Sequence, residues 1–292
     1  MHPRVPDAVQ AWVQSLQRLG STGDRPGDFK LVDTPTRRLS QAHLNLFEAC
    51  PRKFQHLYLD QLAVPASPLQ QERARWGNQF HLLMQQRELA LPLAPLFDTE
   101  PQLESTLQAL EQVAPELFIP QPSAQRDAEH SRSLSQQGFL LTAVYDLLIT
   151  TPEQAQIIDW KTYLRPRARA ELARDWQTRL YLFLLAATSD YAPEQIRLTY
   201  WFVQVSPQPQ ALTFTYSRQQ HEQTSQALQV LLTDLEAALS CYHHGEPLPQ
   251  VEPQAGLCPS CPFSHRCDRL ASAATPPPEW PAVIATIPER IP

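Results

Sequence analysis

Two apolar runs of the sequence are each followed by acidic side chains that could bind a metal ion. Asp146 ends the segment 141–146, and Asp159 follows the run 157–158, with Lys161 two positions later. Side chains alternate along a β-strand, so Asp159 and Lys161 are expected on one face. If the two strands pair, Asp146 and Asp159 can converge on Mg²⁺, which is usually held by one or two carboxylates with water and phosphate. Lys161 would then lower the pKa of an attacking water or neutralise charge on a phosphate.

The Asp-x-Lys triplet alone does not decide between an active site and ordinary surface chemistry. Such triplets are frequent, and a solvated strand end often carries an ion pair of this kind. The motif therefore needs support from its surroundings before it predicts catalysis.

Four of the five cysteines have a spacing that suits a metal centre. Cys258, Cys261 and Cys267 form a C-x2-C-x5-C cluster, and Cys50 stands alone far earlier in the chain. Four thiolates suffice for a 4Fe–4S cluster or a structural zinc site. Zinc is the more common answer to such spacing, although a zinc ribbon normally pairs two close knuckles. Cys241 lies within a predicted helix and is expected to be a bystander.

Basic side chains follow the Asp-x-Lys triplet and could contact phosphates near a metal site. They are Arg165, Arg167, Arg169 and Arg174. An ordinary charged loop and helix face is the competing interpretation of this run. Tryptophans in the same part of the chain could stack on bases, but most tryptophans at such spacing are core residues, and none is assigned here.

The hydrophobic pattern predicts an α/β fold with a small mixed sheet flanked by helices. Leu44, Phe47 and Phe54 recur at helical spacing after Ser40, with an interruption at Pro51. Further helices are expected at 8–19, 76–91, 101–115, 168–188 and 218–244. Strands are expected at 138–150, 156–162, 195–205 and 210–216, whereas the polar segment 123–137 is predicted to be a loop.

Composition narrows the class of protein. The net charge of −6 argues against a protein that coats nucleic acid by bulk charge, although a local basic groove stays compatible. The longest apolar run, 180–187, is far shorter than a membrane span requires. The first twenty residues carry polar side chains where a signal peptide needs an apolar stretch. We therefore expect a cytoplasmic protein without membrane contact, in which closely spaced cysteines are metal ligands rather than disulfides.

From Ser40 onward the chain resembles the RecB-like nucleases of the PD-(D/E)XK superfamily, because four motifs occur in the order of that family. They are Gly77–His81 for Gly-x-x-x-His, Asp146 for the single Asp, Asp159–Lys161 for Asp-x-Lys, and Gln177–Tyr181 for Gln-x-x-x-Tyr. The resemblance implies a restriction-endonuclease-like core and a metal-dependent DNA nuclease. The resemblance covers most of the chain, from about residue 40 to about residue 268.

The resemblance also implies roles for individual residues. His81 would join Asp146 and Asp159 as a ligand of Mg²⁺ or Mn²⁺, and its imidazole slightly favours Mn²⁺. Gln177 and Tyr181 are four residues apart and share a helix face. That face would turn towards the metal and orient Lys161 or the DNA backbone.

The cysteines extend the resemblance to AddB-type nucleases and CRISPR-associated adaptation nucleases. Those families combine an early cysteine followed by proline with a terminal C-x2-C-x5-C cluster. The resemblance implies a 4Fe–4S cluster, held by Cys50, Cys258, Cys261 and Cys267, that joins the N- and C-terminal segments of the nuclease domain. Its role would be structural.

The expected organisation is an extension at 1–36, a nuclease domain at 37–271 and a proline-rich tail at 272–292. The expected function is DNA cleavage by a single-strand-preferring exonuclease in repair, recombination or CRISPR adaptation. No Walker A motif is present, so a helicase or another repair or CRISPR protein could act as a partner. The main alternative is a weak or inactive DNA-binding subunit, because Ala143 replaces a glycine that is usual in the family. A zinc-ribbon interaction protein is the third reading.

Overall fold

The computed structural model describes residues 37–119 and 121–269 of the chain. The predicted extension at 1–36, with its expected helix at 8–19, lies outside the described residues. So does the predicted tail at 272–292. The domain boundaries stay predictions for this reason.

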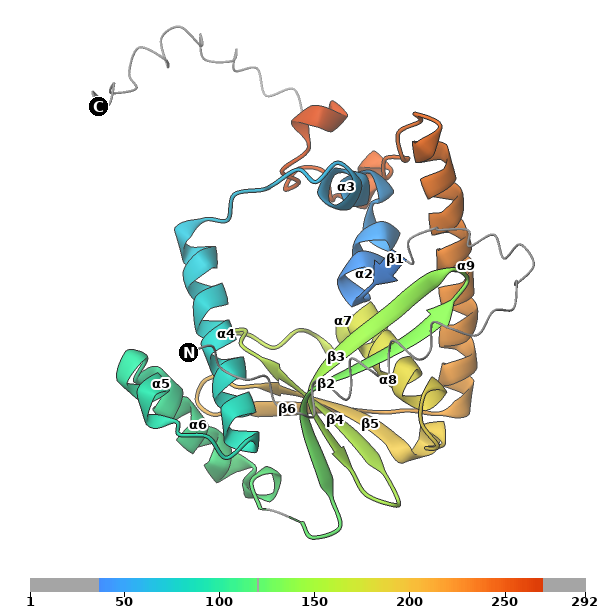
Figure 1. Cartoon of the computed structure of the whole chain (residues 1–292). Helices are drawn as coiled ribbons and strands as arrows, with labels where there is room; N and C mark the ends of the chain where they lie inside the picture. The colour runs from blue at the N-terminus through green and yellow to red at the C-terminus, as the bar shows by residue number, and fades with distance from the viewer. Residues whose placement is uncertain (1–36, 120, 270–292) are drawn as a thin grey trace, which may run out of the picture. The chain divides into compact units, whose positions relative to one another are not determined.

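A mixed six-stranded sheet forms the centre of the fold (Figure 1). Its strands are β1 (Arg37–Leu39), β2 (Gln125–Gln136), β3 (Phe139–Thr150), β4 (Ala155–Lys161), β5 (Ile196–Phe202) and β6 (Gln210–Thr215). β3 pairs with β1 in parallel and with β2 and β4 in antiparallel fashion. β5 pairs with β4 in parallel and with β6 in antiparallel fashion. The predicted α/β fold with a small mixed sheet is confirmed.

Helices cover both faces of this sheet. They are α2 (Gln41–Ala49), α3 (Pro51–Phe54), α4 (Pro68–Glu88), α5 (Ala94–Thr99), α6 (Gln102–Val113), α7 (Arg169–Arg174), α8 (Trp176–Ala187) and α9 (Arg218–His243). One face packs against α2, α8 and α9, which bury Leu44, Leu180 and Leu232. The other face packs against α4 and α6, which bury Phe80 and Leu107 (Figure 1). No helix in the described ranges combines the length and the apolar character of a membrane span.

The predicted loop at 123–137 is wrong, because most of this segment forms strand β2. β2 pairs with β3 along its length except at Glu129, and a tight turn at Gln137 and Gly138 joins them, with positive φ at both residues. Two-residue hairpin turns favour such backbone angles. The strand is polar because its side chains are mostly half-buried or exposed, so it lacks the apolar alternation that signals a strand.

The helix predicted at 168–188 is divided into α7 and α8 at Asp175. This residue adopts an extended conformation, with φ −61° and ψ 135°. Within residues 37–119 and 121–269, the other predicted helices and strands are present, with shifts at their ends. The largest shift is in α4, which begins at Pro68 after the Ser67 cap instead of at Trp76.

β3 is forked, and the fork creates room for polar side chains inside the sheet. β2 occupies one edge of β3, so β1 and β4 share the other edge. β1 pairs with residues 139–141 and β4 with residues 147–150. Between them a short stretch of β3, which ends at Asp146, has no strand partner on this edge.

Candidate active site

Asp159 and Lys161 lie on the same face of β4, as the alternation of side chains predicts. Both are buried, with exposed fractions of 2% and 9%. The Lys161 Nζ atom is 2.5 Å from Asp159 Oδ2. Burial raises the pKa of Asp159, against the opposing effect of the Lys161 charge. Burial also acts to lower the pKa of Lys161, but the charge of Asp159 outweighs it and the pKa of Lys161 is raised.

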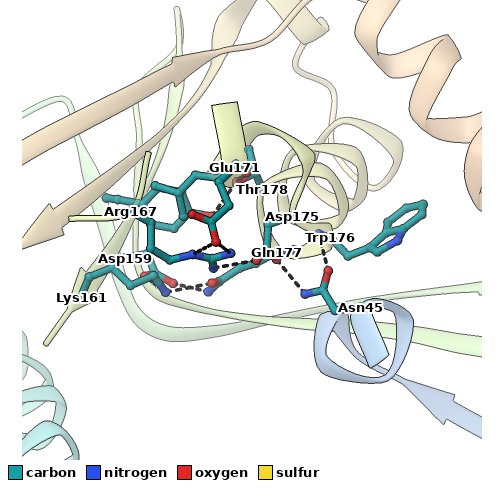
Figure 2. A network of polar contacts seen from close by, with 11 residues as sticks. Asn45, Asp159, Lys161, Arg167, Glu171, Asp175, Trp176, Gln177 and Thr178 are labelled. Atoms are coloured by element: carbon teal, nitrogen blue, oxygen red, sulfur yellow. Dashed lines mark hydrogen bonds and ion pairs between the residues drawn. The ribbon is translucent and has the colours of Figure 1, made fainter. Parts of the chain in front are cut away.

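Gln177 joins the two members of this ion pair (Figure 2). Its side-chain Nε2 donates to Asp159 Oδ1 at 2.6 Å, and its Oε1 accepts from Lys161 Nζ at 2.8 Å. One amide group therefore fixes both side chains of the Asp-x-Lys motif. The arrangement is not the solvated surface ion pair that the triplet alone would allow.

Asp146 lies at the fork of β3, and its side chain takes the place of a backbone carbonyl as the hydrogen-bond acceptor for β4. Its Oδ2 accepts the backbone N–H of Trp160 at 2.7 Å. Beyond the Leu147–Ile158 pair the β3–β4 ladder has ended, so this N–H has no carbonyl partner from β3. A buried amide without a partner is unfavourable, and the carboxylate satisfies it. The other carboxylate oxygen, Oδ1, lies 3.3 Å from His81 Nδ1.

His81, Glu129 and Asp146 form a group that could hold a divalent cation. Their ligand atoms all lie within 4.8 Å of one another. Burial raises the pKa of Glu129, and the charge of Asp146 raises it further. A cation between these groups would relieve that repulsion, and one imidazole with two carboxylates is a donor set that suits Mg²⁺ or Mn²⁺. The residues present therefore fit a divalent metal.

Asp159 is not a member of this group of three. Its carboxylate is turned to Lys161 and Gln177 instead. It is nevertheless close enough for its charge to act on its neighbours, because Asp146 contributes to raising the pKa of Asp159. The two other predicted metal ligands, His81 and Asp146, are brought together.

Glu129 is the site residue that the sequence analysis missed. It lies in β2, within the segment predicted to be a loop. The hairpin places it opposite Asp146, between the pairs Ala128–Leu147 and His130–Tyr145, and its φ of 51° marks a local irregularity of the strand. Once the hairpin with its turn at Gln137 and Gly138 is recognised, residues equally far from the turn on the two strands lie opposite each other. This rule places Glu129 opposite Asp146.

Gly77 explains the spacing of the Gly-x-x-x-His motif. A Cβ atom at this position would lie 3.0 Å from Thr162 Oγ1, just after the end of β4. The glycine therefore lets α4 approach the Asp-x-Lys strand closely. This approach brings His81, one turn later on α4, to the fork of β3.

Tyr181 is packed beneath the site rather than exposed in it. The side chain is 4% exposed, and its ring meets that of Tyr145 at a centroid distance of 5.1 Å. The Tyr145 hydroxyl donates to the Tyr181 backbone carbonyl at 2.9 Å. Burial and the charges of Asp159 and Asp146 raise the pKa of Tyr181, so the phenol stays protonated.

The four predicted phosphate-binding arginines differ in their surroundings. Arg165 and Arg174 are exposed. Arg167 is ion-paired with Glu171 at 2.7 Å and with Asp175 at 2.9 Å. Arg169 donates to the Thr213 carbonyl and lies over the Phe214 ring. Arg165 and Arg174 are thus the two of the set whose charge is not committed to such contacts.

Ala143, the departure from the family pattern, causes no strain. It is buried in β3 and does not belong to the residues with positive φ. The glycine that is usual here is therefore not required by the backbone of this chain. Ala143, which was the reason for the alternative of a weak or inactive subunit, therefore causes no backbone strain at this position.

The cysteines at the two ends of the described chain line one pocket. They are Cys50, Cys258, Cys261 and Cys267, with Arg52 and Lys53 beside them. Burial raises the pKa of Cys267, and the three other cysteines contribute to the rise while Arg52 opposes it. The two chain ends also meet directly, because Arg52 Nε donates to the Leu248 carbonyl at 2.6 Å.

The cysteine sulfurs are not gathered into a finished ligand set. No three of them, among the residues described, come within 4.8 Å of one another. A tetrahedral zinc ion with Zn–S bonds of about 2.3 Å holds its sulfurs roughly 3.8 Å apart, which is closer than this arrangement. The nearby Arg52 and Lys53 would offset the negative charge of four thiolates. The described residues bring the four cysteines to one pocket without forming a metal site, so the choice between zinc and a 4Fe–4S cluster stays a prediction.

Comparisons with known proteins give two structural neighbours and one family. A solved protein from Eubacterium rectale, described as a candidate exonuclease, matches with 10% identity and a TM-score of 0.48 over 91% of this chain and 100% of its own. A protein named SSO0001 matches with 12% identity and a TM-score of 0.36 over 92% of this chain and 98% of its own. A search of curated proteins found no significant match. The sequence profile of the PD-(D/E)XK nuclease superfamily matches residues 38–268. The chain belongs to the PD-(D/E)XK nuclease superfamily.

Proposed function

We propose that the chain is a divalent-metal-dependent deoxyribonuclease that hydrolyses phosphodiester bonds. Membership of a nuclease family implies a nucleic-acid substrate. The observation that carries the proposal is the buried Asp159–Lys161 pair, locked by Gln177, next to the His81, Glu129 and Asp146 group. A binding protein has no need to bury a charged pair at this expense, whereas a hydrolase uses it.

The residues would divide the work as follows. His81, Asp146 and Asp159 would hold Mg²⁺ or Mn²⁺, with Glu129 as an additional ligand. Bound there, the cation would polarise the phosphate and acidify a water molecule. Lys161 would supply a fixed positive charge where negative charge develops on the phosphate. Gln177 would keep Lys161 and Asp159 oriented, and Tyr181 would support the helix face beneath them.

The test is a cleavage assay on end-labelled single- and double-stranded DNA with Mg²⁺ or Mn²⁺. Asp146→Asn is the sharpest variant, because an amide oxygen can still accept the Trp160 N–H while the charge is lost. We expect cleavage to fall by about a hundred-fold or more. Asp127→Asn, on the neighbouring strand, is the matched control and should stay within about two-fold.

Two outcomes would contradict the proposal. One is a wild-type protein that binds DNA but shows no metal-dependent cleavage, which would favour the DNA-binding subunit. The other is equal cleavage by the wild type and Asp146→Asn. The end-labelled substrates also test the exonuclease action and single-strand preference that the resemblance implies.

We further propose that Cys50, Cys258, Cys261 and Cys267 hold a 4Fe–4S cluster that ties the ends of the nuclease domain together. The support is their shared pocket and the adjacent Arg52 and Lys53, whose charges would offset those of the thiolates. Closing so long a loop would stabilise the fold by several kcal/mol on the disulfide analogy, about 4–5 kcal/mol for long loops. Iron and sulfide content of anaerobically purified protein tests this, and a colourless protein with one zinc ion would refute it.

A helicase or CRISPR partner stays a prediction, as do the domain boundaries at residues 36 and 271. The exposed Arg165 and Arg174 are the side chains of the basic run that we expect to contact DNA phosphates. Their loss should weaken DNA binding in a salt-dependent way.

A further inference from the structure

The junction between α7 and α8 carries hydrogen bonds that reach across the fold. The first N–H groups of a helix have no partners within it. At the start of α8, Asp175 Oδ1 accepts the Gln177 N–H at 2.8 Å. The preceding N–H, of Trp176, is accepted by Asn45 Oδ1 at 2.9 Å. Asn45 belongs to α2, so a second helix completes this cap.

The Asn45 side chain uses both ends of its amide here (Figure 2). Besides accepting from Trp176, its Nδ2 donates to Asp175 Oδ1 at 2.7 Å. Burial acts to raise the pKa of Asp175, but hydrogen bonds from Gln177, Asn45 and Arg167 outweigh it and lower the pKa. The carboxylate is thus an ionised acceptor for Asn45. Asn45 fixes the two residues that immediately precede Gln177.

Gln177 is sensitive to small movements of its backbone. Its side-chain amide bonds at once to Asp159 at 2.6 Å and to Lys161 at 2.8 Å. A shift of the start of α8 would lengthen one or both of these bonds. Displacements of about 1 Å in a catalytic arrangement can lower rates by about a hundred-fold.

We propose that Asn45 is a positioning residue that holds Gln177, and through it the Asp159–Lys161 pair, in the geometry for catalysis. The inference rests on the proposed nuclease function. In this proposal α2, which ends next to Cys50, not only packs against the sheet but also sets the position of α8, the helix with the Gln-x-x-x-Tyr motif.

A purely structural role for this contact is the competing explanation, and the chain offers a matched control. Glu48, one turn further along α2, accepts from Trp176 Nε1 at 3.1 Å. This bond joins the same two helices but does not reach the backbone next to Gln177. Glu48→Ala should therefore lower the unfolding temperature much as Asn45→Ala does, without the same effect on the site.

The experiment is a double-mutant cycle of Asn45→Ala and Gln177→Ala in the full chain, with two readouts. The first is kcat at saturating DNA, and the second is Mn²⁺ affinity, measured from the electron paramagnetic resonance signal of free Mn²⁺. We expect Asn45→Ala to lower kcat by about ten- to a hundred-fold and to weaken Mn²⁺ binding several-fold. In the Gln177→Ala background the same change should alter both readouts by less than about two-fold, because the group on which Asn45 acts is gone.

Equal effects of Asn45→Ala in both backgrounds would overturn the proposal, as would an effect of Glu48→Ala on kcat and Mn²⁺ affinity as large as that of Asn45→Ala. The Mn²⁺ readout separates this proposal from the nuclease function. If the wild type binds Mn²⁺ without cleaving DNA, the nuclease proposal fails, and the cycle in Mn²⁺ affinity still decides whether Asn45 positions the site.

Discussion

Removing the Lys161 charge should destabilise the protein in a way that depends on pH. In Lys161→Met the Asp159 carboxylate, which is 2% exposed, keeps only the Gln177 amide as a side-chain partner. Breaking a buried ion pair by removing one partner typically lowers the free energy of unfolding by about 3–5 kcal/mol. We expect a loss of that size at pH 8, because the unpaired carboxylate must stay charged in the core or take up a proton.

The sign of the pH dependence follows from Asp159. Burial already raises its pKa, and the loss of Lys161 removes an effect that lowers it, so the pKa rises further. An acid whose pKa is raised by folding favours the folded state at low pH and loses that contribution as pH rises towards the folded pKa. The wild type shares the raised pKa of Asp159, at about 7, so both proteins gain stability at the same rate below that pH. The loss caused by Lys161→Met should therefore shrink by up to about 1.4 kcal/mol per pH unit from pH 8 down to about pH 7 and stay constant below it.

Urea unfolding at several pH values measures this effect, with two comparisons. The double variant Asp159→Asn/Lys161→Met removes both charges and should recover most of the stability, since neutral replacements of buried ion pairs are often tolerated. Arg73→Met, an exposed cation on α4, should change the free energy of unfolding by no more than about 0.5 kcal/mol. A loss below about 1 kcal/mol for Lys161→Met at pH 8 would refute the reasoning, because the pair would then be hydrated.

Three further changes probe other parts of the site. Glu129→Gln should weaken Mn²⁺ affinity by about ten-fold, measured by calorimetry, because it removes one carboxylate of the metal group; unchanged affinity would exclude Glu129 as a ligand. Gly77→Ala should lower the free energy of unfolding by about 1–3 kcal/mol and should also lower activity, because its Cβ would press on Thr162. A variant as stable as the wild type would show that Thr162 can move away without loss of stability. Cys267→Ser should reduce bound iron and lower the unfolding temperature, whereas Cys241→Ser, on the exposed surface of α9, should change neither; equal iron content in both would contradict the assignment.

The sequence predicted the parts of the fold that have strong local signals. The apolar runs before Asp146 and Asp159 indicated β3 and β4, and the leucine spacing indicated α9. The alternation of side chains correctly placed Asp159 and Lys161 on one face. The association of Gln177 with Lys161 came from the resemblance to the nuclease family and not from a local pattern.

Other features depend on contacts that no local pattern contains. The side chains of β2 are polar because they are mostly exposed or half-buried. The segment forms a strand because it pairs with β3, and its own residue pattern does not indicate this. Glu129 was missed with it. The break at Asp175 also depends on a distant residue, because Asn45 accepts the Trp176 N–H and helps a new helix to begin there.

The fork of β3 unites these observations. A sheet that paired regularly would leave no opening for carboxylates, and it would satisfy the Trp160 N–H with a backbone carbonyl. Here the ladder stops, Asp146 takes over that hydrogen bond, and its other oxygen is left free to face His81. On the other edge of β3, the register of the β2–β3 hairpin brings Glu129 to Asp146. Asp146 is therefore required twice, as the partner of a buried amide and as a negatively charged ligand, and this double requirement explains why the site lies at the one place where β3 is without a partner strand on this edge.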